Sequence, residues 1–135
     1  SSAGDSPPVS NTIDKFPFST DANATDVGDL TVARDAVSGQ SSSASGYTSG
    51  GRNPSPTLDT IDKFPFASDA NASDVGDLTM AINHSAGASS STHGYSSGGN
   101  PKNNVIDKFS VTSDGNATDV GDATINERAR TGQQV

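Results

Sequence analysis

The sequence predicts an all-β chain of three tandem repeats, each built from short antiparallel strands of the kind found in a propeller blade. Three observations support this prediction: an Asp-rich and Glu-poor composition, a shortage of large apolar residues, and an internal repeat. Of the 16 acidic residues 15 are Asp, and Lys and Arg together number only 8. Because few residues favour helices, the chain should consist of strands and turns.

The shortage of apolar residues limits what the chain can do alone. Leu, Ile, Val and Phe supply only 22 of the 135 residues, which is too few for a conventional core. Ser and Thr contribute 35 residues and Gly another 14, and the formal net charge is −8. This composition is typical of disordered or loop-rich extracellular chains. It argues against a self-sufficient globular enzyme.

The composition also excludes several partners and chemistries. No Cys is present, so disulfides, thiolate nucleophiles and thiolate metal ligands are ruled out. No apolar run approaches the ~18 residues of a membrane span, which predicts no membrane insertion. The negative net charge makes nucleic acid a poor partner. The first residue is Ser1 rather than Met, which favours a processed chain or a segment of a longer one.

An internal repeat organises the chain. The hexapeptide Ile-Asp-Lys-Phe-Pro-Phe at residues 13–18 returns at 61–66 and, as Ile-Asp-Lys-Phe-Ser-Val, at 106–111, with spacings of 48 and 45 residues. An Asp-rich stretch follows each copy, and Ser-rich sequence separates the copies. We expect residues 13–60, 61–105 and 106–135 to form repeats 1, 2 and 3, with the third truncated, and residues 1–12 to form an N-terminal loop or incomplete blade.

Each repeat is expected to hold three or four short strands. In repeat 1 the first strand, at about residues 12–19, places Phe16 and Phe18 on one face and Ile13 on the other. Pro17 supplies no ladder donor, which puts this segment at a sheet edge or a bulge.

Two further strands are expected in repeat 1. One covers residues 27–34 and puts Leu30 and Val32 on one face. The other covers about residues 41–49, and the Gly50-Gly51 pair that follows ends it in a turn or lets another backbone come close.

The repeat length is typical of β-propeller blades, and a β-solenoid or a fibre-forming β repeat is the alternative. The Tyr followed shortly by Gly-Gly, at residues 47–51 and 95–99, resembles Kelch-type propeller repeats. The whole unit resembles near-identical repeats in predicted proteins of marine phages and marine metagenomes, and this resemblance covers nearly the full chain. The Trp expected late in a Kelch blade is absent. The enzymatic and actin-associated roles of some Kelch proteins are therefore not implied.

Three blades cannot close a ring, which needs at least four. In the repeat alignment Ser1 lies opposite Ser49, and Gly132-Gln133 lies opposite Gly39-Gln40, so both ends are expected to be incomplete blades. We expect the chain to complete its sheets through copies of itself or through other virion or surface proteins, as a closed ring or an open fibre.

The Asp residues are patterned, since 12 of the 15 belong to the repeat. The run at residues 21–29 spaces oxygen-bearing side chains at alternate positions and closes with a carboxylate, which is similar to the calcium loops of integrin-type propellers. It departs from them at Thr25-Asp26, where the calcium loop has Asp-Gly. The resemblance implies one calcium ion per repeat, held by Asp21, Asn23, Thr25 and Asp29, by Asp69, Asn71, Ser73 and Asp77, and by Asp114, Asn116, Thr118 and Asp122.

An Asx-type turn is the alternative for this run, and it is the interpretation we favour. In such a turn Asp21 and Asn23 accept hydrogen bonds from local amides, Asn23 tolerates a left-handed backbone, and Gly28 forms a bulge.

The other polar residues have simple expected roles. Asn23, Asn71, Asn83 and Asn116 match the N-glycosylation pattern, as chance predicts in so Asn-rich a sequence. His84 and His93 are expected in solvated loops, and Lys15, Lys63 and Lys108 should pair with carboxylates or flank blade edges. No Ser, His and acid recur in a catalytic arrangement, so no catalytic residue is predicted.

The aromatic residues are expected in the core. Phe16, Phe18, Phe64 and Phe66 should lie between blades. Tyr47 and Tyr95 have the same expected role, with a sugar-binding face as the alternative.

Together these features predict a non-enzymatic extracellular or virion-surface repeat protein that acts through assembly, as a structural or receptor-binding part of a phage appendage. The phage context comes from the resemblance alone. The alternative is a calcium-dependent adhesion or carbohydrate-binding propeller module that contacts cell-surface glycan. Calcium is the only candidate cofactor.

Overall fold

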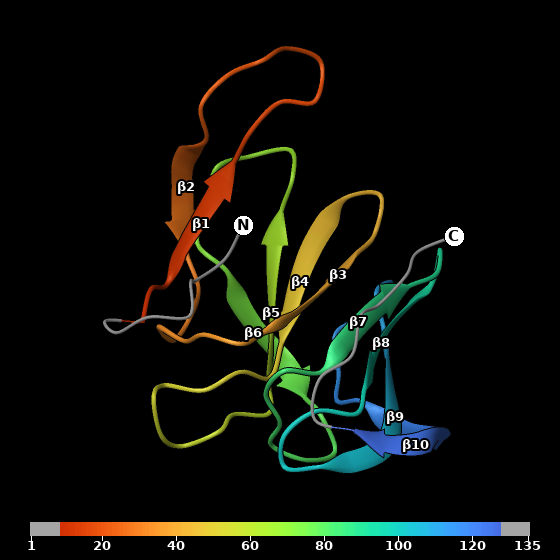
Figure 1. Ribbon diagram of the computed structural model, residues 1–135. Helices are drawn as coiled ribbons and strands as arrows, with labels where there is room; N and C mark the ends of the chain where they lie inside the picture. Colours follow the sequence, from red (N-terminus) through yellow and green to blue (C-terminus); the bar gives the residue numbers. More distant parts are fainter. Residues whose placement is uncertain (1–8, 128–135) are drawn as a thin grey trace.

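The structure is a computed structural model that describes residues 9–127, and these residues form ten strands in three antiparallel sheets (Figure 1). No helix occurs in this range, which confirms the all-β prediction. It follows that residues 9–127 contain no helix able to cross a membrane. The predictions for Ser1 and Gly132-Gln133, and for the parts of the expected segments at 1–8 and 128–135, lie outside the described residues.

The sheets are simple meanders in which each strand pairs with its neighbours along the chain. The two-stranded sheet consists of β1 (Thr12–Lys15) and β2 (Thr25–Asp29). The middle sheet consists of β3 (Ser38–Ser41), β4 (Ser45–Ser49), β5 (Thr60–Pro65) and β6 (Ser73–Asp77). The C-terminal sheet consists of β7 (Ala86–Ser89), β8 (His93–Ser97), β9 (Asn103–Ser110) and β10 (Thr118–Glu127).

The sheets are out of phase with the repeats of the sequence. Each four-stranded sheet takes two strands from the end of one repeat and two from the start of the next. As far as residues 9–127 show, the two-stranded sheet consists of the pair that begins repeat 1. In Figure 1 the three sheets fan out in chain order, with the middle sheet between the other two.

The segment expected as one strand at residues 41–49 is a hairpin, so that prediction was wrong. Its turn is made by Ser42, whose Oγ accepts hydrogen bonds from the backbone amides of Ala44 and Ser45 at 3.2 and 3.0 Å. A Ser side chain that bonds nearby amides in this way competes with an extended backbone and reverses the chain. The Gly-Gly prediction is confirmed, because Gly51 N donates to Ile82 O at 2.8 Å and a Cβ on Gly50 would overlap the same carbonyl.

The strand expected at residues 27–34 is shifted, and β2 ends at Asp29. Its register with β1 skips Val27, so the bulge expected at Gly28 is confirmed. Beyond Asp29 the chain turns, Leu30 is buried, and Val32 is 37% exposed. Leu30 and Val32 therefore do not share one buried face.

The edge position expected for the first strand is found in repeat 1 only. In the part of the chain that the structure describes, β1 pairs on one side alone. Its equivalent in repeat 2, β5, lies between β4 and β6, with Pro65 as its last residue. Because Pro lacks an N–H, the end of a strand accommodates it at little cost.

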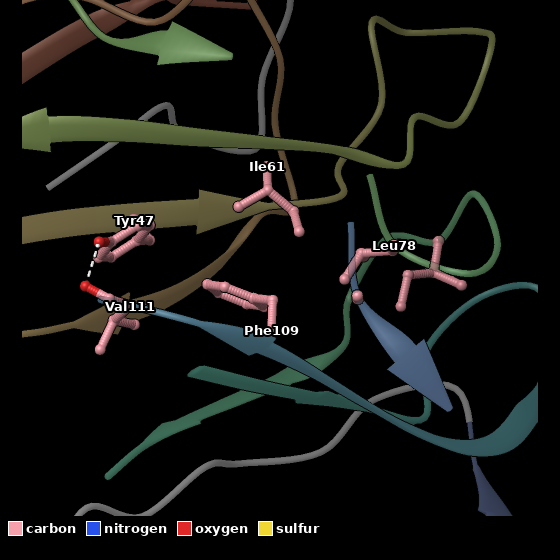
Figure 2. Close-up of a cluster of buried hydrophobic side chains, with 7 residues drawn as sticks. Tyr47, Ile61, Leu78, Phe109 and Val111 are labelled. Carbon is pink, nitrogen blue, oxygen red and sulfur yellow. Dashed lines mark hydrogen bonds between the residues drawn. The ribbon is translucent and has the colours of Figure 1, made fainter. Parts of the chain in front are cut away.

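The main hydrophobic core lies between the middle sheet and the C-terminal sheet (Figure 2). The Tyr47 ring lies 5.7 Å from the Phe109 ring, and its hydroxyl donates to Val111 O at 3.2 Å. The core role expected for Tyr47 is thus confirmed. The other buried members are Ile61, Leu78, Ile82 and Ala117. Two sheets share this core, so each contributes only a few apolar side chains.

Candidate functional site

Neighbouring repeats meet along a polar seam, which we define as the contacts that the first hairpin of one repeat makes with that of the next. In the first seam, Lys15 Nζ lies 3.2 Å from Asp69 Oδ1. Both backbone polar groups of Asp29 bind repeat 2. Its N–H donates to Asn71 Oδ1 at 3.1 Å, and its carbonyl accepts from Ala72 N at 2.8 Å. One ion pair and two backbone bonds therefore join repeats 1 and 2.

The second seam repeats these contacts with the equivalent residues of repeats 2 and 3. Lys63 Nζ lies 2.9 Å from Asp114 Oδ1. The N–H of Asp77 donates to Asn116 Oδ1 at 3.1 Å, and the carbonyl of Asp77 accepts from Ala117 N at 2.8 Å. The pairing expected for Lys15 and Lys63 is confirmed, and in both cases the partner belongs to the following repeat.

At each seam a buried carboxylate of one repeat also accepts hydrogen bonds from a Thr of the preceding repeat. Asp62 accepts hydrogen bonds from the N–H and the Oγ1 of Thr31, at 2.9 and 2.7 Å. Asp107 accepts the same two bonds from Thr79 at the same distances. Both carboxylates are buried. This role was not predicted from the sequence, although Asp and Thr recur at these positions in all three copies.

Glycine allows the two backbones of a seam to touch. Gly28 and Gly76 have φ angles of 155° and 152°. A Cβ on Gly28 would overlap the carbonyl of Ala70, and one on Gly76 would overlap the carbonyl of Gly115. Gly121 occupies the same position in repeat 3 with φ of 146°, and no atom of the described residues lies within 4 Å of its Cβ position.

The two ends of the repeat array expose the two halves of a seam. At one end, repeat 3 presents Lys108 and Gly121, together with the backbone of Asp122. At the other end, repeat 1 presents Asp21 and Asn23. Within residues 9–127, none of these groups makes a seam contact.

The residues of the predicted calcium loops are divided between seams. Asp69 and Asn71 contact Lys15 and Asp29 of the preceding repeat, as described above. The hydroxyl residues of the predicted sets, Thr25, Ser73 and Thr118, begin β2, β6 and β10 and are exposed. No three His, Cys, Asp or Glu side chains of residues 9–127 lie close enough together to hold a metal ion. The calcium sites stay a prediction.

The Asx turn exists, but at a different residue from the one expected. Asp26 Oδ1 accepts from Gly28 N at 3.1 Å, and Asp74 and Asp119 make the equivalent bond in repeats 2 and 3. Asn71 accepts from the preceding repeat rather than from a local amide. In the described range only Ala36 and His84 combine a side chain with positive φ, so Asn23 is not left-handed. The Asx turn at Asp26 and Asp74 holds the bulge in place. Asp69 and Asn71, two residues apart, instead bind the preceding repeat.

We expect calcium to leave the thermal unfolding midpoint unchanged, because oxygens of Asp69, Asn71, Asp114 and Asn116 already accept hydrogen bonds in the seams. Thermal melts followed by circular dichroism, with calcium and with a chelator, check this. A midpoint that rises with calcium concentration would instead support the predicted ion sites.

The ion pair between Lys63 and Asp114 makes the stability of the folded chain depend on pH. The hydrogen bond to Asp114 raises the pKa of Lys63 above its ordinary value of 10.5. A Lys with a raised pKa stabilises the folded state below its unfolded pKa, and this contribution is lost as pH rises through the folded pKa. We expect a small alkaline loss of stability, about 0.2–1 kcal/mol for so exposed a pair. Urea unfolding of Lys63→Met, compared with the parent protein at neutral and alkaline pH, should show a smaller difference at alkaline pH.

Exposed aromatic side chains line a pocket of about 620 Å³ between the two-stranded sheet and the middle sheet. Phe16 is 50% exposed, Phe18 97% and Phe66 45%, and Phe64 is only half-buried. The prediction that these four rings form an inter-blade core was therefore wrong. Phe16 and Phe18 are open on one side because, in the described residues, no strand lies next to β1 in the way that β4 and β8 lie next to its equivalents β5 and β9.

The remaining predicted residues take minor roles. Asn83 is buried, which excludes it as a glycan acceptor in the folded state, whereas Asn23, Asn71 and Asn116 are exposed. His84 Nδ1 lies 2.7 Å from Asn83 Oδ1, and His93 Nδ1 lies 2.9 Å from Thr92 Oγ1. Both rings are half-buried rather than fully solvated.

Tyr95 is half-buried, unlike its equivalent Tyr47. Its side chain therefore contributes less to a core than its place in the repeat predicts.

Comparison with known proteins adds no relative, since neither a protein-family model nor a curated protein matches the chain. The function is therefore inferred from the geometry of the seams and of the aromatic pocket.

Proposed function

We propose that this protein is a non-enzymatic repeat module that works as an assembly, as a structural or receptor-binding part of a phage appendage or of another extracellular surface. The observation that carries this proposal is the seam itself. It is built twice from equivalent residues inside the chain, and its two halves are open at opposite ends of the array.

The open halves are complementary in charge and in hydrogen bonding. If repeat 1 of a second copy docks on repeat 3, Lys108 faces Asp21, and the N–H of Asp122 faces the side chain of Asn23. Gly121 leaves room for the backbone of the second copy, as Gly28 and Gly76 do inside the chain. This contact joins two different faces, so it extends into a fibre unless the rotation per copy closes a ring.

The proposal includes a propeller-type architecture for the sheets. Four-stranded antiparallel meanders that pack face to face on their neighbours are typical of propeller blades. The antiparallel pairing of the strands favours blades over the coils of a parallel solenoid. In such an array each blade buries its apolar side chains against the neighbouring blade, as the middle and C-terminal sheets do in their shared core.

Light scattering and native mass spectrometry test the proposal at micromolar concentration. We expect masses that are multiples of the 13.6 kDa chain. Electron microscopy of the same sample separates a closed ring from an open fibre. A stable, folded monomer across the concentration series would overturn the proposal.

A carbohydrate-binding or calcium-dependent adhesion module is the second candidate, and the exposed rings of Phe16 and Phe18 favour it. Aromatic faces at the mouth of a pocket are suited to sugar rings. Retention on a glycan array, measured with and without calcium, tests this candidate. Binding that Phe18→Ala abolishes would support it, and an array without retained protein would exclude the glycans tested.

A further inference from the structure

Within the described part of the chain, the first strand has one unpaired edge. β1 pairs with β2 on one side, and no other strand in residues 9–127 pairs with it on the other. Its equivalents in the next two repeats are paired on both sides: β5 with β4 and β6, and β9 with β8 and β10. Because unpaired backbone groups at a sheet edge can pair with another strand, the edge of β1 is a potential binding surface.

The internal sheets show which strand fits such an edge. Gly46 on β4 lies opposite Phe64 on β5, and a Cβ on Gly46 would overlap the Phe64 ring. Gly94 on β8 lies opposite Phe109 in the same way, and a Cβ there would overlap the Phe109 ring. In both sheets the Phe ring covers a glycine, and a Tyr follows that glycine in the sequence.

Phe16 is the equivalent ring on the open edge, and half of it is exposed. The opposite wall of the pocket is also uncovered. A Cβ on Gly39 of β3 would meet no atom of residues 9–127 within 4 Å, whereas one on its equivalent Gly87 would overlap the backbone of Gly39. The 620 Å³ pocket therefore occupies the place that two further strands, equivalent to β3 and β4, take in the neighbouring sheets.

We propose that this groove binds a β-hairpin from a partner protein, and that the second strand of this hairpin carries Gly-Tyr. That strand pairs antiparallel with β1 and places its glycine under the Phe16 ring. The first strand of the hairpin then lies against Gly39. This binding goes beyond the head-to-tail contact proposed above, because it uses the edge of β1 and not the residues of the seam.

A synthetic peptide with the sequence of residues 38–51, which contains Gly46-Tyr47, is the probe. Its fluorescently labelled form is titrated with the full chain, and binding is followed by anisotropy at a concentration where the chain is monomeric. We expect saturable binding at one peptide per chain. A peptide with Gly46→Val should bind about ten-fold more weakly or worse, because the added side chain overlaps the Phe16 ring.

Variants of the protein locate the bound peptide. Phe16→Ala and Phe18→Ala change exposed rings, so the chain should stay folded, and both should weaken binding. Ile125→Ala changes a side chain of β10 that is also exposed, by 58%, and should bind as the parent does. Hydrogen exchange should slow at amides of β1 when the peptide is present.

The outcomes separate this inference from the proposed function. It is overturned if the parent peptide does not bind, if the Gly46→Val peptide binds equally well, or if both Phe variants bind normally. Peptide binding to a chain that never assembles would leave this inference standing and remove the proposed assembly. Assembly of a chain that does not bind the peptide would leave the proposed assembly standing and overturn the hairpin-binding inference.

Discussion

Asp62→Ala is expected to lower the free energy of unfolding by about 3–5 kcal/mol, because it leaves a buried guanidinium without its counter-charge. Arg34 Nη2 lies 3.1 Å from Asp62 Oδ2, and both side chains are fully buried. Burial lowers the pKa of Arg34, and the nearby Asp62 carboxylate opposes this effect. The substitution also removes the acceptor for both Thr31 donors. Urea unfolding followed by circular dichroism measures the loss.

Arg34→Ile is the matched control, because the next repeat already has Ile at the equivalent position. Repeat 2 has Ile82 at the equivalent position, and there Asp107 is buried and, among residues 9–127, accepts two side-chain hydrogen bonds, both from Thr79. Arg34→Ile gives Asp62 the same surroundings. It also removes Nε and Nη1, which have no hydrogen-bond partner within the described structure. We expect a smaller loss than for Asp62→Ala, because the Asp62 carboxylate keeps both hydrogen bonds from Thr31. A loss as large as that of Asp62→Ala would contradict this account of the ion pair.

Gly76→Ala is expected to destabilise the chain by about 1–3 kcal/mol more than Gly121→Ala. The two glycines share nearly the same φ, so the strain of placing Ala in this conformation is similar in both variants. They differ in surroundings, since a Cβ on Gly76 overlaps the carbonyl of Gly115, whereas one on Gly121 meets no atom of the described chain within 4 Å. The extra loss therefore measures how closely repeats 2 and 3 must approach.

Chemical unfolding at a dilution where the chain is monomeric measures both variants. Circular dichroism spectra before unfolding show whether each variant has kept its sheets. Equal losses in the two variants would mean that the close backbone approach at the seam contributes nothing to stability.

The repeat and its strands could be predicted from the sequence because they depend on local pattern. Spacings of 48 and 45 residues, Gly-Gly pairs and alternating apolar residues indicated strands and turns. The burial of Tyr47 followed from the same pattern. The turn at Ser42 was missed, because a run of Ser and Ala continues a strand as readily as it reverses one.

The seams and the open rings could not be predicted in this way, because they depend on which repeat lies beside which. Lys15 and Asp69 are 54 residues apart, and no local spacing links them. Phe16 and Phe109 occupy equivalent positions in the repeat, yet one ring is half exposed and the other is buried. Sequence pattern assigns both the same environment. Phe109 has β8 beside it and packs on the ring of Tyr47, whereas within residues 9–127 no strand pairs with the edge of β1 beside Phe16.

Sedimentation velocity of two complementary variants tests the central claim most directly. Gly121→Ala blocks the face of repeat 3, and the pair Asp21→Lys with Asn23→Ala weakens the face of repeat 1. All three positions are exposed, so each variant should fold, as circular dichroism can verify. We predict assemblies for the parent, monomers for each variant alone, and dimers that do not grow further when the two are mixed. Variants that assemble alone as the parent does, or a mixture that stays monomeric, would contradict the claim that the two ends of the array complete one seam.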